Sequence, residues 1–114
     1  MFKLKADDTF TWPVKAKTPD DGKFKTVTFS AMFNILPQTE ITGLMGDEGD
    51  KSAGALRVLD AALVSFTDID VEGDDGEPVT DHDERKEIIF KYPFMVTALT
   101  EAFAAGTAGR RLKN

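Results

Sequence analysis

The fold is decided by residues 10–35, which read FTWPVKAKTPDDGKFKTVTFSAMFNI. Apolar residues occupy every second position on both sides of a turn-forming centre. The first set is Phe10, Trp12, Val14 and Ala16, and the second is Val27, Phe29, Ala31, Phe33 and Ile35. An alternation with period two places one set of side chains on a buried face and the other set in water. The two runs therefore predict a pair of antiparallel strands.

The connection between the runs, Thr18–Lys23, has the composition of a tight turn. Proline fixes φ, aspartate bonds its own backbone, and glycine accepts a positive φ. Pro13 has no amide proton, so its nitrogen must face away from a neighbouring strand. Upstream, Phe2, Leu4 and Ala6 also alternate, and Asp7-Asp8 is suited to turning the chain. The first third is therefore an antiparallel hairpin or a three-strand meander.

After Pro37 the apolar spacing becomes helical. A short helix is expected from Gln38 to Met45, followed by a polar loop over residues 46–50 and a helix over about residues 52–65 with Ser52 as its N-cap. The apolar stripe expected for this second helix consists of Leu56, Leu59, Leu63 and Phe66, broadened by Ala55, Val58 and Ala62. These residues indicate an amphipathic helix.

The segment 67–80 is acidic and rich in turns, and Ile69, Val71 and Val79 predict a short hairpin across it. Asp81 and Glu84 have the spacing of a capping box at the start of a helix that ends near Lys91 and buries Ile88 and Ile89.

Pro93 suits the first turn of a last helix, in which Gly106 and Gly109 loosen the end. Its expected apolar stripe is Met95 or Val96, Leu99, Ala102 and Phe103. Leu99 and Phe103 are expected to pack against Leu59 and Leu63. The whole pattern predicts an α+β fold, a hairpin or meander followed by three to four helices, in one domain over residues 1–114.

The composition limits the classes of function. The chain has 114 residues, 41% of them apolar, and no cysteine, which excludes disulfides, thiolate chemistry and cysteine-ligated zinc. No apolar run follows a basic start, so we expect no signal peptide, and no stretch is apolar enough to cross a membrane.

The net charge of −6 is unevenly distributed. Residues 37–91 hold fifteen acidic and five basic residues, whereas both ends of the chain are slightly basic. A nucleic-acid binder normally has a basic footprint, so we expect no nucleic acid as a partner. The acidic region either keeps the chain soluble or docks a basic partner.

The sequence holds little material for catalysis or metal binding. His82 is the one histidine, and its neighbours Asp81, Asp83 and Glu84 point apart on a helical turn, which favours a solvated cap over a metal site. An EF-hand that starts at Asp68 has Val79 where the bidentate glutamate belongs, and one that starts at Asp70 has Asp75 where the turn glycine belongs. No GxGxxG motif or P-loop occurs. We therefore expect no catalytic, cofactor-binding or metal-binding residues, no cofactor, and no enzymatic activity.

A lysine-rich outer face of the predicted sheet can be interpreted in two ways. It is formed by Lys3, Lys5, Lys15, Lys17 and Lys25. These side chains either contact phosphates or keep strand edges solvated, which discourages aggregation.

Several motifs occur in the order found in one family. A tryptophan-containing hairpin closes on the P-x-x-G-K turn at Pro19–Lys23, and an F-x-x-x-F strand end follows at Phe29–Phe33. A D-G-x-P turn lies at Asp75–Pro78, and a Y-P helix from Tyr92-Pro93 leads to a basic end with Arg110, Arg111, Lys113 and Asn114. In this order the chain resembles the tail assembly chaperones of long-tailed, siphovirus-type (lambda-like) bacteriophages. It departs from them at Phe66, where many relatives carry tryptophan.

The resemblance implies a non-catalytic chaperone in the cytoplasm of the infected bacterium. Such proteins bind the tape-measure protein, keep it soluble, help to recruit tail-tube subunits and are absent from the mature virion. The alternative is a small structural virion protein, such as a head–tail connector or tail component. Self-association is also expected, because a chaperone that covers a long rod must line up in many copies, with the basic sheet of one copy beside the acidic 67–84 region of the next.

The resemblance further implies a translational frameshift near the stop codon that adds a C-terminal extension able to reach the tail-tube protein. The residues Leu112-Lys113-Asn114 permit the slip site A-AAA-AA(C/U) if the leucine codon ends in A and the lysine codon is AAA. The nucleotide sequence of the gene tests this prediction, because leucine and lysine each have other codons that would remove the slip site. An ordinary frayed C-terminus is the alternative.

Overall fold

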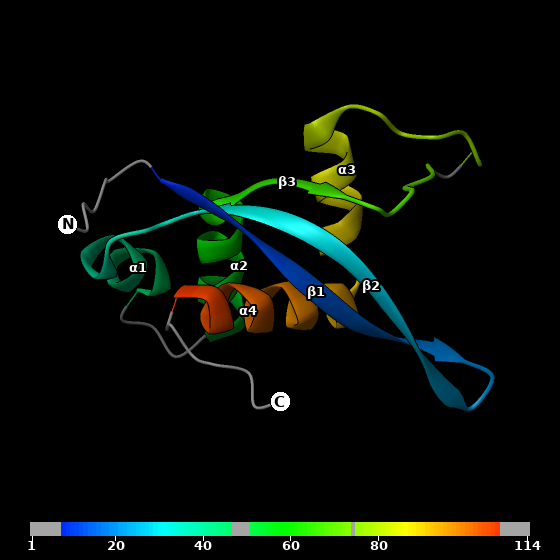
Figure 1. Cartoon of the computed structure of the whole chain (residues 1–114), viewed down its shortest axis with the longest axis horizontal. Helices are drawn as coiled ribbons and strands as arrows, with labels where there is room; N and C mark the ends of the chain where they lie inside the picture. Colours follow the sequence, from blue (N-terminus) through cyan, green and yellow to red (C-terminus); the bar gives the residue numbers. More distant parts are fainter. Residues whose placement is uncertain (1–7, 47–50, 74, 108–114) are drawn as a thin grey trace.

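A computed structural model describes residues 8–46, 51–73 and 75–107, with the side chains of residues 51 and 52 outside the description (Figure 1). The described residues form three strands and four helices. Their order is β1 (Thr9–Asp20), β2 (Lys23–Asn34), α1 (Gln38–Met45), α2 (Lys51–Ala62), β3 (Leu63–Thr67), α3 (His82–Phe90) and α4 (Pro93–Thr107). The expected α+β architecture is confirmed, with the antiparallel hairpin first and the helices mainly after it.

Strands β1 and β2 pair without interruption from Thr9↔Asn34 to Asp20↔Lys23. The two-residue turn between them has φ values of 48° at Asp21 and 83° at Gly22. Two consecutive positive φ values match the type I′ turn, whose twist suits the flanking strands. The predicted turn and alternation are confirmed, since Val14, Ala16, Phe29, Ala31 and Phe33 are buried. β1 lies at the edge of the sheet, where Pro13 is tolerated.

The third strand differs from the expectation. Helix α2 ends at Ala62, and residues 63–67 form β3, which pairs antiparallel with β2, so the predicted helix over 52–65 is three residues too long. The register shifts between Met32 and Phe33, and this irregularity leaves Val64 as an extra residue. Leu63 and Phe66 therefore both face the core although they are three residues apart, a spacing that imitates a helix. The segment Leu63–Thr67 also contains the β-branched and aromatic residues that suit a strand.

The helix starts agree with the sequence more closely. Helix α1 follows Pro37 with the predicted bounds. Helix α2 begins at Lys51, so Ser52 lies inside its first turn and is not the N-cap. Asp81 caps α3, and its carboxylate accepts a hydrogen bond from the amide of Glu84 at 3.1 Å, which confirms that part of the capping box. Pro93 is the first residue of α4, as predicted.

The core lies between the sheet and helices α2, α3 and α4. Its most deeply buried large side chains are Phe29, Phe33, Phe66, Leu59, Leu99 and Val14. Phe103 is also buried, and its ring lies 5.4 Å from Phe33 and 6.2 Å from Phe10. The last helix therefore packs Phe103 on aromatic residues of the hairpin, and Leu99, Leu59 and Leu63 are buried in the same core cluster, as the sequence suggested. Helix α4 contacts β1 more extensively than it contacts α2.

Gly106 is part of this packing. A Cβ atom at Gly106 would lie 2.4 Å from Cε2 of Phe10, closer than any stable contact. The sequence suggested that Gly106 loosens the end of the last helix. The residue lies in the last turn of α4, and its missing side chain also admits the Phe10 ring.

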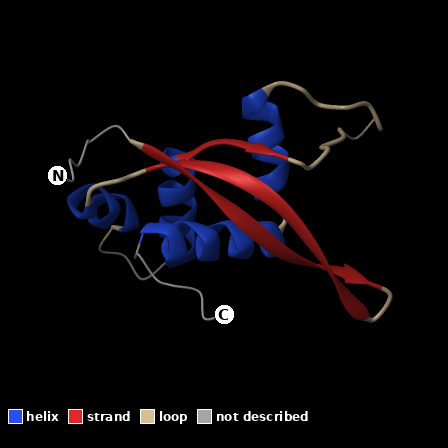
Figure 2. Cartoon of the chain, in the orientation of Figure 1, coloured by secondary structure: helices blue, strands red, loops and turns tan. Residues whose placement is uncertain are grey.

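The end of the β1–β2 hairpin extends beyond all the helices (Figure 2). The sheet has three strands only where β3 pairs with Ser30–Phe33, so the rest of the hairpin is a two-stranded ribbon. Several predictions fall outside the described residues: the strand with Phe2, Leu4 and Ala6, Lys3 and Lys5, residues 47–50 of the polar loop, and Gly109 to Asn114.

Candidate functional site: two grooves and a protruding hairpin tip

An apolar groove lies between α2 and α4, with a volume of about 540 Å³. Its apolar lining consists of Ala55, Leu56, Phe90, Pro93 and Val96, and Lys91 and Glu101 stand among its polar residues. Leu56 is 36% exposed, although the sequence placed it in the buried stripe of the helix. The apolar side chains of α2 that are buried are Val58, Leu59 and Ala62, on a neighbouring face. The excess of apolar positions on α2 was the sequence signal for this surface.

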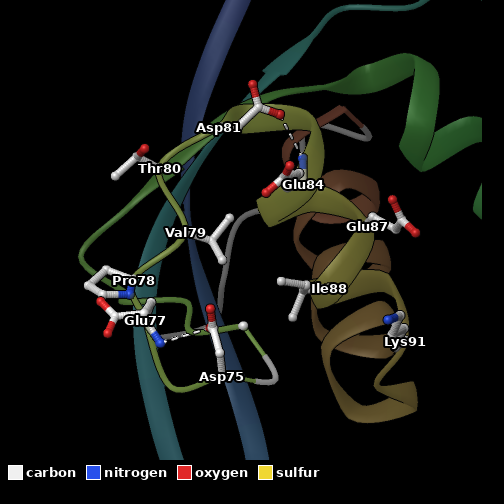
Figure 3. A pocket seen from close by; sticks show the side chains of 11 residues that line it. Asp75, Glu77, Pro78, Val79, Thr80, Asp81, Glu84, Glu87, Ile88 and Lys91 are labelled. Carbon is white, nitrogen blue, oxygen red and sulfur yellow. Dashed lines mark hydrogen bonds between the residues drawn. The ribbon is translucent and has the colours of Figure 1, made fainter.

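A second groove, the acidic groove, lies between the 73–81 segment and α3 and has a volume of about 620 Å³ (Figure 3). Val79 and Ile88 point toward one another across it and are both half-buried. Its acidic lining residues are Asp75, Glu77, Asp81, Glu84 and Glu87, and among the described residues Lys91 is the single basic one in the lining. The groove therefore combines an apolar floor with a negative rim.

Backbone hydrogen bonds hold the loop side of the acidic groove. The amide of Val79 donates to the carbonyl of Val71 at 2.8 Å, and the amide of Gly73 donates to the carbonyl of Glu77 at 3.0 Å. The Asp75 carboxylate accepts the amide of Glu77 at 3.0 Å. The predicted hairpin between Val71 and Val79 is thus confirmed. Ile69 lies outside it, and its carbonyl accepts a hydrogen bond from Arg85.

His82 and the acidic residues that the sequence offered as possible metal ligands lie along this region. His82 is the first residue of α3, and its ring lies 6.4 Å from that of Phe66. The guanidinium of Arg85 lies over the same Phe66 ring at 4.4 Å, a cation–π contact. Within the described ranges, no group of three or more His, Cys, Asp or Glu side chains is placed to hold a metal ion.

The tip of the β1–β2 hairpin carries an apolar side chain in water. Phe24 is 71% exposed and pairs across the hairpin with Pro19, which is also exposed. Lys23 and Lys25 flank Phe24 and are exposed. The sequence contained the signal, because Phe24 has the opposite parity to Val27, Phe29, Ala31 and Phe33 on the same strand. An aromatic residue on the solvent side of a strand is a candidate contact residue.

Of the predicted lysine face, the structure describes Lys15, Lys17 and Lys25, all of them exposed. Lys15 and Lys17 share the outer face, but Lys25 pairs with Thr18 and lies on the other face of the ribbon, so its place in the predicted face is wrong. Lys15 and Lys17 line a hollow of about 340 Å³ beside α4, together with Phe94, Thr97, Ala98 and Glu101. Among the described residues no single helix is long and apolar enough to cross a membrane. Helices α3 and α4 reach that length and composition only as a pair, which bends by 107°.

Comparison of the chain with family models, with curated proteins and with solved structures gives no match.

Proposed function

We propose that this chain is a non-catalytic phage tail assembly chaperone that binds the tape-measure protein, keeps it soluble and helps to recruit tail-tube subunits. The order of the sequence motifs supports the proposal, and the apolar groove between α2 and α4 supplies a surface suited to the task. Before the tail tube encloses it, a tape-measure protein is long, largely helical and exposes apolar stripes. A small protein with an apolar groove can cover such a stripe.

The observation that carries the proposal is the apolar groove. Grooves of this kind accept one face of an amphipathic helix, whose anchor residues recur at i, i+3, i+4 and i+7. Leu56 and Val96 approach the groove from two helices, α2 and α4, and Phe90 adds an aromatic wall. Thr97 and Thr100 supply hydroxyls in the lining, where they can bond polar groups at the edge of a bound helix.

The chain acts in the cytoplasm of the infected bacterium and is left out of the finished particle. Copies associate with one another along the tape-measure protein. A fraction of the chains carries the frameshifted extension, through which they reach the tail-tube protein.

Co-expression with the tape-measure protein of the same phage tests the proposal. The wild-type chain should co-purify with the tape-measure protein and increase its soluble fraction. Leu56→Asp places a charge in the groove and should weaken co-purification about tenfold or more, because an unpaired charge is desolvated in the contact. Thr28→Asp, at an exposed position of β2 that lines neither groove, is the matched control and should leave the complex intact.

Two outcomes would contradict the proposal. Equal capture of the tape-measure protein by the wild type and by a folded Leu56→Asp variant would remove the groove from the contact. Stoichiometric amounts of the chain in purified particles would favour the alternative, a small structural virion protein such as a head–tail connector or tail component.

A further inference from the structure

The tip of the β1–β2 hairpin has the properties of a ligand for another surface. Phe24 is 71% exposed, and the Asp21-Gly22 turn holds the two strands in register beside it. Aromatic side chains contribute much of the energy of interfaces when they enter a groove, and an isolated one in water contributes none of it. The position of Phe24 therefore favours a contact that a single copy of the chain does not make.

The hairpin cannot place its tip in a groove of its own chain. Its pairing runs without a break from Thr9↔Asn34 to Asp20↔Lys23, so it forms one continuous ribbon. This ribbon leads away from the helices (Figure 1). Any groove that receives Phe24 must belong to another molecule.

Charge distinguishes between the two grooves as the receptor. Lys23 and Lys25 flank Phe24 in the chain and project from the opposite face of the ribbon, and Lys17 and Lys15 lie further along on the same face as Phe24. The apolar groove offers Glu101 and Lys91, which balance one another. The acidic groove offers five carboxylates against Lys91. Complementary charge steers association and fixes its register, so the acidic groove is the better match.

The acidic groove is also free to accept cations. The ion pair that the structure shows within the described ranges joins Lys86 to Asp60 at 3.1 Å and involves no carboxylate of the groove. Val79 and Ile88 provide an apolar floor between the two acidic sides (Figure 3). A volume of about 620 Å³ is ample for one aromatic ring.

We propose that the hairpin tip of one copy binds in the acidic groove of a second copy, with Phe24 on Val79 and Ile88 and with the lysines on the two faces of the tip, Lys17, Lys23 and Lys25, near the acidic residues Glu77 and Glu87. This inference rests on the proposed function, since it supplies the contact by which copies line up. The tip and the groove are different surfaces, so the contact is head-to-tail, and it generates an open chain of copies unless the rotation between them closes a ring.

Sedimentation velocity of the full chain at low ionic strength tests the contact. The wild type should associate increasingly with concentration and dissociate as salt is raised, because the charged rim is screened. The tip variant Phe24→Asp and the groove variant Glu77→Lys/Glu87→Lys should each associate about tenfold or more weakly. Circular dichroism spectra and melting temperatures like those of the wild type would show that both variants are folded.

Mixing the two variants gives a sharper result. Each retains one intact surface, but the tip variant's intact groove can receive only the groove variant's intact tip. An equimolar mixture should therefore form one-to-one dimers that do not grow. A single chain with Lys23→Glu, Lys25→Glu, Glu77→Lys and Glu87→Lys should regain association, because the charges are exchanged and still complementary.

Three results would overturn the inference. They are a wild type that stays monomeric at high concentration and low salt, a folded Phe24→Asp variant that associates like the wild type, and loss of self-association in Leu56→Asp, which would make the apolar groove the receptor. Capture of the tape-measure protein is measured separately. A chain that binds the tape-measure protein and never self-associates refutes this contact while leaving the proposed function intact.

Discussion

The two halves of the β1–β2 hairpin belong to one continuous antiparallel ladder, yet they differ in burial. In the inner half, Thr9–Ala16 pairs with Val27–Asn34, and this half contains the buried residues Val14, Ala16, Phe29, Ala31 and Phe33. In the outer half, Lys17–Asp20 pairs with Lys23–Thr26, and no residue is buried. The inner half is part of the core, and the outer half is a ribbon in water.

The difference shows which forces hold each half. The inner half is stabilised by burial against α4 and the neighbouring helices and by its pairing with β3. An isolated two-stranded ribbon is marginally stable in water, so the outer half depends on its turn and on continuation of the inner ladder. A segment that contributes little to the core is free to carry a side chain such as Phe24 for binding.

The largest expected effect is the loss of Phe103, which packs on the inner half. Phe103→Ala removes a ring in contact with Phe10 and Phe33 and should lower the free energy of unfolding by about 3–5 kcal/mol. Phe24→Ala makes the same chemical change in the outer half and should alter it by less than about 0.5 kcal/mol. Urea denaturation of both variants provides the measurement. Similar losses for the two variants would show that the outer half also belongs to the core.

A pair of glycine substitutions tests how tightly the inner half is packed. Gly106→Ala drives a methyl group into the Phe10 ring and should destabilise the fold by about 1–3 kcal/mol. Gly43→Ala is the control, because Gly43 lies within α1 with open space around its Cα, and alanine there should stabilise by up to about 1 kcal/mol. Thermal melts of both variants should shift in opposite directions. A shift upward for Gly106→Ala would place Phe10 elsewhere.

The turn provides a test confined to the outer half. Gly22 has a φ of 83°, and Gly22→Ala should introduce about 1–2 kcal/mol of local strain. Gly22→Asn is the matched control, since asparagine tolerates a positive φ. Native-state hydrogen exchange should become faster in the outer half and stay unchanged at Phe29 and Phe33. Faster exchange along the whole hairpin would show that both halves open as one unit.

The sequence predicted the hairpin, its turn, the start of α4 and the cap of α3, because each depends on local patterns. It failed at β3, where the sheet irregularity gives Leu63 and Phe66 a helical spacing on a strand. It also failed to identify the apolar groove: the excess of apolar positions on α2 was visible, but which of them stays exposed depends on how α2 and α4 are placed. Exposure of Phe24 was readable from its parity on β2.

The smallest effect compares one kind of hydrogen bond in the two halves. In the outer half, the hydroxyl of Thr18 donates to the carbonyl of Lys25 at 3.0 Å and is exposed. In the inner half, Nδ2 of Asn34 donates to the carbonyl of Ala61 at 3.3 Å and is partly buried. Water replaces an exposed partner readily, so Thr18→Val, which keeps the side-chain shape, should change the free energy of unfolding by less than about 0.5 kcal/mol.

Asn34→Ala should instead cost about 1 kcal/mol, because the carbonyl of Ala61 at the end of α2 loses its donor in a place that water reaches less easily. Urea denaturation of the two variants side by side measures the difference. The comparison also bears on binding. If the inner half stabilises the fold and the outer half serves binding, the outer half must be dispensable for folding. If Thr18→Val costs more than Asn34→Ala, the outer half contributes to the stability of the fold. A loss of association in tip variants would then need to be separated from a loss of folding.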